Sequence, residues 1–127
     1  MNLEKVVFGF FIVFAATLNF GFVYGDLDNP IHHDIWEFFA AFIVTLIATV
    51  LKFGDRTHVG AVHLASSLVA VLQLFAASMV WFFAVPGPDG LLLPKSMSAI
   101  VSLSAGALMA NIVSVIIMII ETTMQRR

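Results

Sequence analysis

Four long apolar stretches run through the sequence almost without charge, and the charged residues lie at their ends or between them. The stretches cover residues 6–24, 35–51, 59–85 and 97–120. A helix needs about 20 consecutive apolar residues to cross the hydrocarbon core of a bilayer, and a charge in its middle is costly. The pattern therefore predicts four membrane-spanning helices, of which the second is near the lower limit of length.

Turn-forming and capping residues occupy the short connections between these stretches. Asp34 or a neighbouring histidine is suited to start the second helix, Asp55 or Thr57 to cap the third, and Pro94 to open the fourth. The four spans and their connections take up residues 1–127, so nothing remains for a separate soluble domain. We therefore expect a single all-α domain, an integral membrane four-helix bundle whose membrane partner is the lipid bilayer.

Composition supports this interpretation and excludes several classes of function. Hydrophobic residues make up 61% of the chain and charged residues 11%, against about 25% charged in ordinary soluble domains. A net charge of −2 without any basic run argues against nucleic acid as a partner. The chain has no cysteine and none of the recognised catalytic motifs, so we expect no enzyme activity.

The basic residues set the expected orientation. With the N-terminus in the cytoplasm, most of them fall inside: Lys5, Lys52, Arg56, Arg126 and Arg127. Lys95 is then the one outer base, as the positive-inside rule favours. The acidic residues show the opposite bias, and both termini are predicted to be cytoplasmic.

The fourth span carries small residues at every fourth position, namely Ser98, Ser102, Gly106 and Ala110. Such a stripe lets two membrane helices pack with their backbones close together. We therefore expect this helix at the subunit interface of a homo-oligomer.

Bulky phenylalanines surround much of the first span: Phe8, Phe10, Phe11, Phe14, Phe20 and Phe22. Side chains of this size prevent close approach of a second backbone on most sides of a helix. We therefore expect the first helix to be peripheral and to face lipid.

Two polar stripes occur at similar depths in the membrane. One follows Ser104, Ala107, Asn111 and Ser114 on the fourth span, and the other follows His63, Ser66, Ala70, Gln73 and Ala77 on the third. The simpler interpretation is that these side chains form hydrogen bonds between helices inside a packed bundle. The alternative is that a stripe from several identical subunits lines an aqueous pore on an oligomer axis.

Acidic and histidine side chains are concentrated in the first outer loop, namely Asp26, Asp28, His33, Asp34 and Glu37. Oxygen ligands attract calcium or magnesium, and histidines extend the choice to transition metals. If the second helix includes His33, then His33 and Glu37 lie one turn apart and could share an ion. A divalent cation is thus the one cofactor the sequence suggests; the alternatives are a solvated, capping loop and a cation-attracting pore mouth.

Five short segments carry recognisable motifs, namely Asn2-Leu3-Glu4-Lys5, Gly25-Asp26-Leu27-Asp28-Asn29-Pro30, Lys52-Phe53-Gly54-Asp55-Arg56-Thr57, Ser67-Leu68-Val69-Ala70 and Ser102-Leu103-Ser104-Ala105-Gly106. Together they resemble a family of short bacterial four-span inner-membrane proteins recorded as a domain of unknown function. The resemblance extends over nearly the whole chain. It implies a multi-pass protein of the bacterial inner membrane and carries no activity with it.

Small-residue packing, polar stripes and outer negative charge occur together in this chain. Our leading hypothesis is an oligomeric membrane protein that acts as a cation channel or cation-handling pore, with inorganic cations as ligands and an acidic outer mouth. The competing hypothesis is a non-conducting accessory or scaffold subunit of a larger membrane complex.

Overall fold

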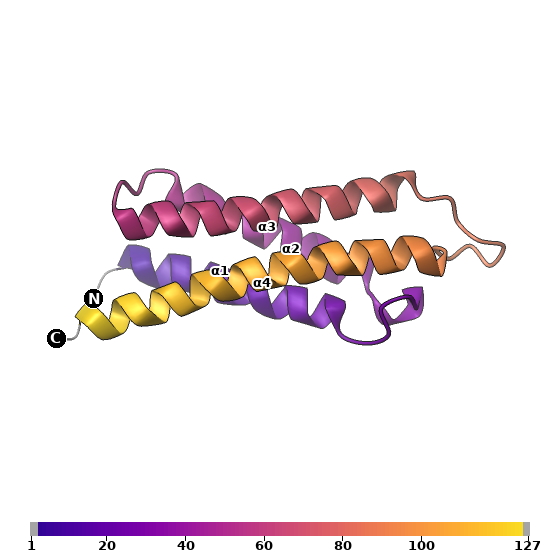
Figure 1. The fold of residues 1–127 in the computed structure, drawn as a ribbon, viewed down its shortest axis with the longest axis horizontal. Helices are drawn as coiled ribbons and strands as arrows, with labels where there is room; N and C mark the ends of the chain where they lie inside the picture. The colour runs from indigo at the N-terminus through magenta and orange to yellow at the C-terminus, as the bar shows by residue number, and fades with distance from the viewer. Residues whose placement is uncertain (1–2, 126–127) are drawn as a thin grey trace.

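The protein is a bundle of four long helices (Figure 1). The computed structural model describes residues 3–125, and this part of the chain contains no β-strand. In chain order the helices are α1 (Leu3–Val23), α2 (Ile35–Lys52), α3 (His58–Phe83) and α4 (Pro94–Gln125). A short 3-10 helix, η1 (Pro30–His32), lies between α1 and α2. The all-α fold expected from the sequence is confirmed.

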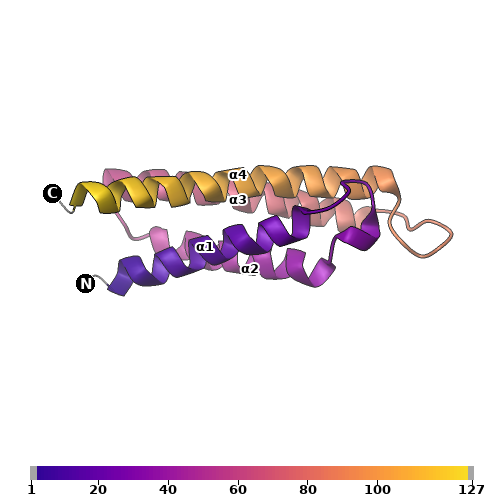
Figure 2. The same ribbon diagram turned by 90° about the horizontal axis from the view of Figure 1, so that it is seen from below.

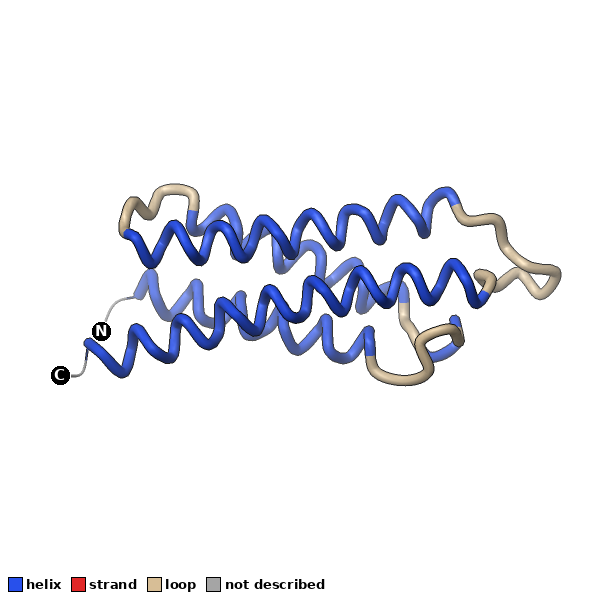
Figure 3. The backbone as a smooth tube through the Cα atoms, in the orientation of Figure 1, coloured by secondary structure: helices blue, strands red, loops and turns tan. Residues whose placement is uncertain are grey.

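Successive helices run antiparallel and form two hairpins that lie side by side (Figure 2). One hairpin is α1 with α2 and the other is α3 with α4; α1 also packs on α4, and α2 on α3. The start of α1 and the end of α4 therefore lie at one end of the bundle, together with the loop 53–57 (Figure 3). We call this the proximal end. The loops 24–34 and 84–93 lie at the opposite, distal end.

All four helices are long and apolar enough to cross a membrane. They overlap the four stretches predicted from hydropathy, but the predicted stretches 6–24 and 59–85 run one and two residues past the ends of α1 and α3. α2 is the shortest at 18 residues and α4 the longest at 32. α4 extends past the predicted 97–120 in both directions because Pro94 starts it and no breaker follows the last apolar residue.

Side chains cap the start of α2 and of α3. Asp34 Oδ1 accepts a hydrogen bond from the Trp36 amide at 3.0 Å, and Thr57 Oγ1 accepts one from the Gly60 amide at 2.9 Å. These bonds satisfy amide groups that have no partner within the helix. Both residues are among those expected to cap these helices, and Pro94 opens α4 as predicted.

The apolar interior has two parts. A distal core contains Phe22, Phe38 and Leu74, and a proximal core contains Phe8 and Ile12. The expectation that the phenylalanines of α1 face lipid is wrong for two of them, since Phe8 is 2% exposed and Phe22 fully buried. The reason is helical spacing, because one face of α1 carries the buried residues Phe8, Ile12, Ala15, Asn19 and Phe22.

Candidate functional site

Polar side chains are buried inside the bundle without hydrogen-bond partners. Eight nitrogen and oxygen atoms in the described part of the chain are sealed from solvent and unpaired, and six residues carry them: Asn19, His63, Ser67, Ser104, Asn111 and Ser114. We call these residues the interior polar set. His63 is 2% exposed and the other five have no surface that a water molecule can reach. In most proteins such atoms find a partner, so each of these needs an explanation.

Helix register shows how the interior polar set is spread through the membrane. A Cβ atom added at Gly106 of α4 would lie 3.1 Å from Gln73 Oε1 of α3, so these two positions face each other. α3 and α4 are antiparallel, so Asn111, five residues after Gly106, lies at a depth similar to that of Ser67, six residues before Gln73. His63 lies about one turn closer to the proximal end than Ser67.

The stripe predicted on α4 does face the interior. Ser104, Ala107, Asn111 and Ser114 are all fully buried. On α3, His63 is buried as expected, but Ser67 takes the inner position in place of Ser66. The buried face of α3 follows Gly60, His63, Ser67, Ala70, Leu74 and Ala77. Ser66 and Gln73 are half-buried at the edge of that face.

Sequence reasoning missed the polar residues that α1 and α2 contribute. Asn19 lies seven residues after Ile12 and three before Phe22, so the spacing of these apolar residues was the signal for its burial. Thr45 and Thr49 of α2 are also buried. Their hydroxyls donate to the carbonyl four residues earlier, at 2.7 and 2.8 Å, which leaves them satisfied within their own helix.

The small-residue stripe of α4 serves partly to pack the chain against itself. Gly106 faces Gln73 of α3, and Ala110 packs against the distal core. Ser98 is half-buried, and Ser102 is exposed on the outside of the bundle. Packing within the bundle therefore accounts for Gly106 and Ala110, while Ser102 faces outward.

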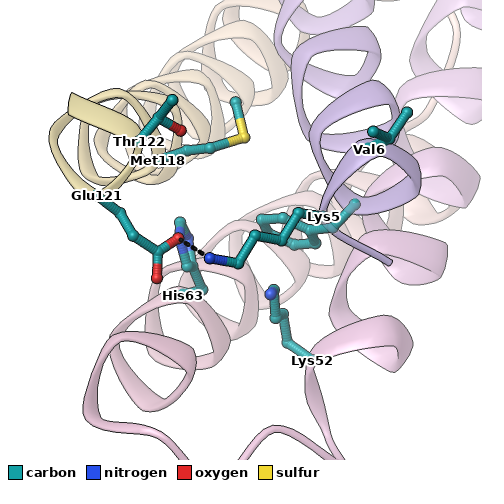
Figure 4. Close-up of a pocket in the computed structure, with 8 residues that line it drawn as sticks. Lys5, Val6, Lys52, His63, Met118, Glu121 and Thr122 are labelled. Atoms are coloured by element: carbon teal, nitrogen blue, oxygen red, sulfur yellow. Dashed lines mark ion pairs between the residues drawn. The ribbon is translucent and has the colours of Figure 1, made fainter. Parts of the chain in front are cut away.

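A cavity of about 200 Å³ opens at the proximal end, where residues of all four helices meet (Figure 4). Lys5 of α1, Lys52 of α2, His63 of α3 and Glu121 of α4 all line it. We call it the proximal cavity. Lys5 Nζ and Glu121 Oε1 form an ion pair across it at 3.7 Å. The cavity thus brings two amines, one carboxylate and one imidazole together.

Lys52 is held beside His63 by contacts on two sides. Its ammonium lies 4.2 Å from the ring centroid of Phe8, and that ring meets the His63 ring edge-on at 4.9 Å. Lys52 Nζ also lies 3.4 Å from Asp55 Oδ2. The Thr57 amide and hydroxyl donate to Asp55 Oδ1, and these bonds, with Lys52 adding to them, hold the pKa of Asp55 below its ordinary value against the effect of burial. The carboxylate is therefore fixed in its charged form beside Lys52.

His33 fastens the distal loop to α1. Its Nδ1 lies 2.5 Å from the Phe22 carbonyl oxygen and its Nε2 lies 2.6 Å from that of Asp26. Carbonyl oxygens only accept, so the ring is the donor in either bond and ties the loop to the end of α1. The predicted pairing of His33 with Glu37 on one helical face is wrong, because α2 begins at Ile35 and His33 precedes it in extended backbone.

The acidic residues of the distal loop are spread apart. Asp26, Asp28 and Asp34 are exposed, and Glu37 is half-buried in the first turn of α2. Within residues 3–125, no three His, Asp or Glu side chains come together as a group that could hold a metal ion. A divalent cation at this loop remains a prediction from the sequence.

Comparison with curated proteins and with solved structures finds no match. A family model does match, over residues 32–122, and its description is "Family of unknown function (DUF6394)". The matched region includes all of α2 and α3 and most of α4. The chain therefore belongs to the DUF6394 family.

Proposed function

We propose that this protein handles cations across a membrane and that the path runs through the interior of the single-chain bundle. The interior polar set is the observation that carries this proposal. Its six side chains come from α1, α3 and α4 and are sealed within the apolar interior. One of them, His63, also lines the proximal cavity, which connects the set to one end of the bundle.

The cost of these groups supports a role beyond packing. A buried donor or acceptor left without a partner costs about 1–3 kcal/mol. A hydrogen bond between membrane helices returns only about 0.6 kcal/mol on average. A bundle built for packing alone would be more stable with apolar residues at Asn19 and Asn111, where both atoms of each amide are unpaired. Polar residues that persist against such a cost are expected at functional sites.

The charges at the two ends favour cations. At the distal end the exposed residues include Asp26, Asp28, Asp34 and Asp89, with Lys95 close by in sequence. At the proximal end Lys5, Lys52 and Arg56 give the basic side that the positive-inside rule assigns to the cytoplasm. Arg126 and Arg127, which support the same orientation, lie outside the described residues. Together with the family resemblance, this charge asymmetry supports a bacterial inner membrane, with both chain ends cytoplasmic.

Burial of the polar stripes favours a path within one chain over a pore on an oligomer axis. Four of the residues proposed to line a pore, His63, Ser104, Asn111 and Ser114, face inward. Homo-oligomerisation through α4 stays a prediction. The exposed Ser102 is the member of the small-residue stripe that can contact a second subunit. A mass measurement of the intact assembly in mild detergent tests it directly.

The structure corresponds to a closed state under this proposal. Five members of the interior polar set have no surface open to water, so a hydrated ion has no passage beside them. Conduction then requires the helices to separate enough to admit water molecules between these side chains. Water would satisfy the unpaired atoms in the open state, which reduces the energetic cost of opening.

Cation flux into proteoliposomes tests the proposal. The wild-type protein should conduct a cation, and Ser67→Ala should reduce the flux. Ser78→Ala is the matched control on the same helix, because the Ser78 hydroxyl bonds the Phe75 carbonyl at 2.7 Å and does not belong to the interior polar set. Equal flux in both variants would argue against an interior path.

Absence of flux in the wild-type protein for protons, sodium, potassium, magnesium and calcium at several voltages would overturn the proposal. Copurification of a stoichiometric foreign membrane protein, together with absent flux, would favour the competing role of an accessory or scaffold subunit.

A further inference from the structure

We infer that the cation is a proton and that His63 passes it between the interior polar set and the proximal cavity. The inference rests on the proposed function and adds to it the identity of the ion and the residue that binds it. Two observations carry it: one ring nitrogen of His63 is sealed and unpaired, and the same ring lines the cavity at the end of the bundle.

The position of His63 joins two environments. Its Nδ1 has neither solvent contact nor a hydrogen-bond partner, and Ser67 follows one turn deeper on the same buried face of α3. On its other side the ring shares the proximal cavity with Lys5, Lys52 and Glu121 (Figure 4). Imidazole exchanges protons near neutral pH and has two nitrogens that can act in turn. The ring can therefore receive a proton on one side and release it on the other.

The charges facing His63 come from every surrounding element. Lys5 of α1 pairs with Glu121 of α4 at 3.7 Å, and Lys52 of α2 pairs with Asp55 of the adjoining loop at 3.4 Å. The two amines and two carboxylates balance, so the ring meets no large excess of either sign.

The chemistry of the interior favours a proton over a metal cation. The other unpaired atoms of the interior polar set belong to three serine hydroxyls and two amides, and no carboxylate is among them. A sodium or potassium ion would lose its hydration shell there without gaining a charged ligand. A proton needs only a transient chain of hydrogen bonds, and hydroxyl groups can both donate and accept them.

The imidazole ring of His63 takes up a proton at one nitrogen and releases one from the other. A neutral imidazole with hydrogen on Nε2 accepts a proton at Nδ1. An N–H bond forms there as an O–H bond of a protonated water molecule breaks. The resulting imidazolium releases the hydrogen of Nε2 to water in the proximal cavity or to the Glu121 carboxylate. The ring is then neutral with hydrogen on Nδ1. Rotation about the Cα–Cβ and Cβ–Cγ bonds turns Nδ1 to the cavity, where one water molecule takes the hydrogen from Nδ1 as another returns one to Nε2, and the ring turns back in its starting state. The same steps in reverse carry a proton from the proximal cavity to the interior polar set.

The test measures proton entry into proteoliposomes that enclose a pH-sensitive dye, driven by a potassium diffusion potential. His63→Gln should lower proton flux at least about tenfold, since a positioned proton-transfer group contributes about 10²–10⁴ to such a step. His58→Gln is the matched control, because His58 is exposed at the start of the same helix. Unchanged flux in His63→Gln would overturn the role of His63.

Ion selectivity of the wild-type protein provides a second measurement that does not depend on folding of the variant. Proton flux should exceed sodium and potassium flux and should slow in D₂O. Sodium or potassium flux without proton flux would overturn this inference and leave the proposed function standing. Absence of any flux would overturn both.

Discussion

Replacing Asn111 by leucine should stabilise the bundle and abolish its cation flux. Both polar atoms of the Asn111 side chain are sealed and unpaired. At about 1–3 kcal/mol for each unsatisfied atom, removing both relieves about 2–6 kcal/mol. Leucine is bulkier, and fitting it into a packed interior costs about 1–3 kcal/mol. With the middle of each range, the expected net result is a gain of about 2 kcal/mol in the free energy of unfolding.

Two measurements are needed, because Asn111→Leu should raise the free energy of unfolding and abolish the cation flux. Reversible unfolding by SDS in mixed micelles gives the free energy, and proteoliposome flux gives the activity. Thr17→Leu is the control, since Thr17 is exposed on the outside of α1 and its change should affect flux little. A less stable Asn111→Leu would show that Asn111 has partners in the membrane, which refutes the reasoning from unpaired atoms. A more stable variant that still conducts would exclude Asn111 from the path.

Three further predictions concern the loops and the first turn of α3. Gly60→Ala should destabilise the protein by about 1–3 kcal/mol, because the added Cβ atom would overlap the Asp55 carboxylate. Gly54→Ala is the control and should be neutral, because a Cβ atom there has no neighbour within 4 Å. Unfolding by SDS measures the stability of both variants. Because the pKa of Asp55 is lowered, its bonds to Thr57 stabilise the proximal turn above the pKa of the unfolded carboxyl and are lost as pH falls through the folded pKa. Protection of the amides in this turn, measured relative to their intrinsic exchange rates, should fall over that range, and protection that does not change with pH would contradict this. His33→Ala should increase amide exchange in the distal loop, because two carbonyl oxygens lose their donor. Unchanged exchange would show that His33 does not fasten this loop to α1.

The fold could be predicted because the membrane imposes simple rules. Uncharged stretches of sufficient length mark the spans, and the residues that cap helices mark their ends. Asp34, Thr57 and Pro94 begin α2, α3 and α4 as these rules require. Hydrogen bonding within each helix is local, so sequence alone carries most of this information.

The inner faces were harder to predict, because lipid is as apolar as the protein interior. A soluble helix shows which side is buried through contrast with its polar side, but the helices of this chain lack that contrast. Ser66 and Ser67 differ by about 100° around α3, and sequence offered no criterion to choose between them. Burial of Ser67 depends on how α3 sits against its neighbours.

The proximal cavity could not be predicted at all. Lys5, Lys52, His63 and Glu121 lie far apart in the sequence and come from four different helices. In the sequence, Lys5 and Lys52 marked only the basic side of the membrane, and His63 only a polar stripe. Only the packing of both hairpins brings the four side chains to one place.

The unequal lengths of the helices tie the protein to the thickness of its bilayer. At 1.5 Å per residue, α2 spans about 27 Å and α4 about 48 Å, against a hydrocarbon core of about 30 Å. α4 can tilt or project, but α2 has no length to spare, and its last residue is Lys52. A thicker membrane would draw that ammonium toward the hydrocarbon or thin the lipid around it, so lipid chain length becomes a way to perturb the charged end of this bundle.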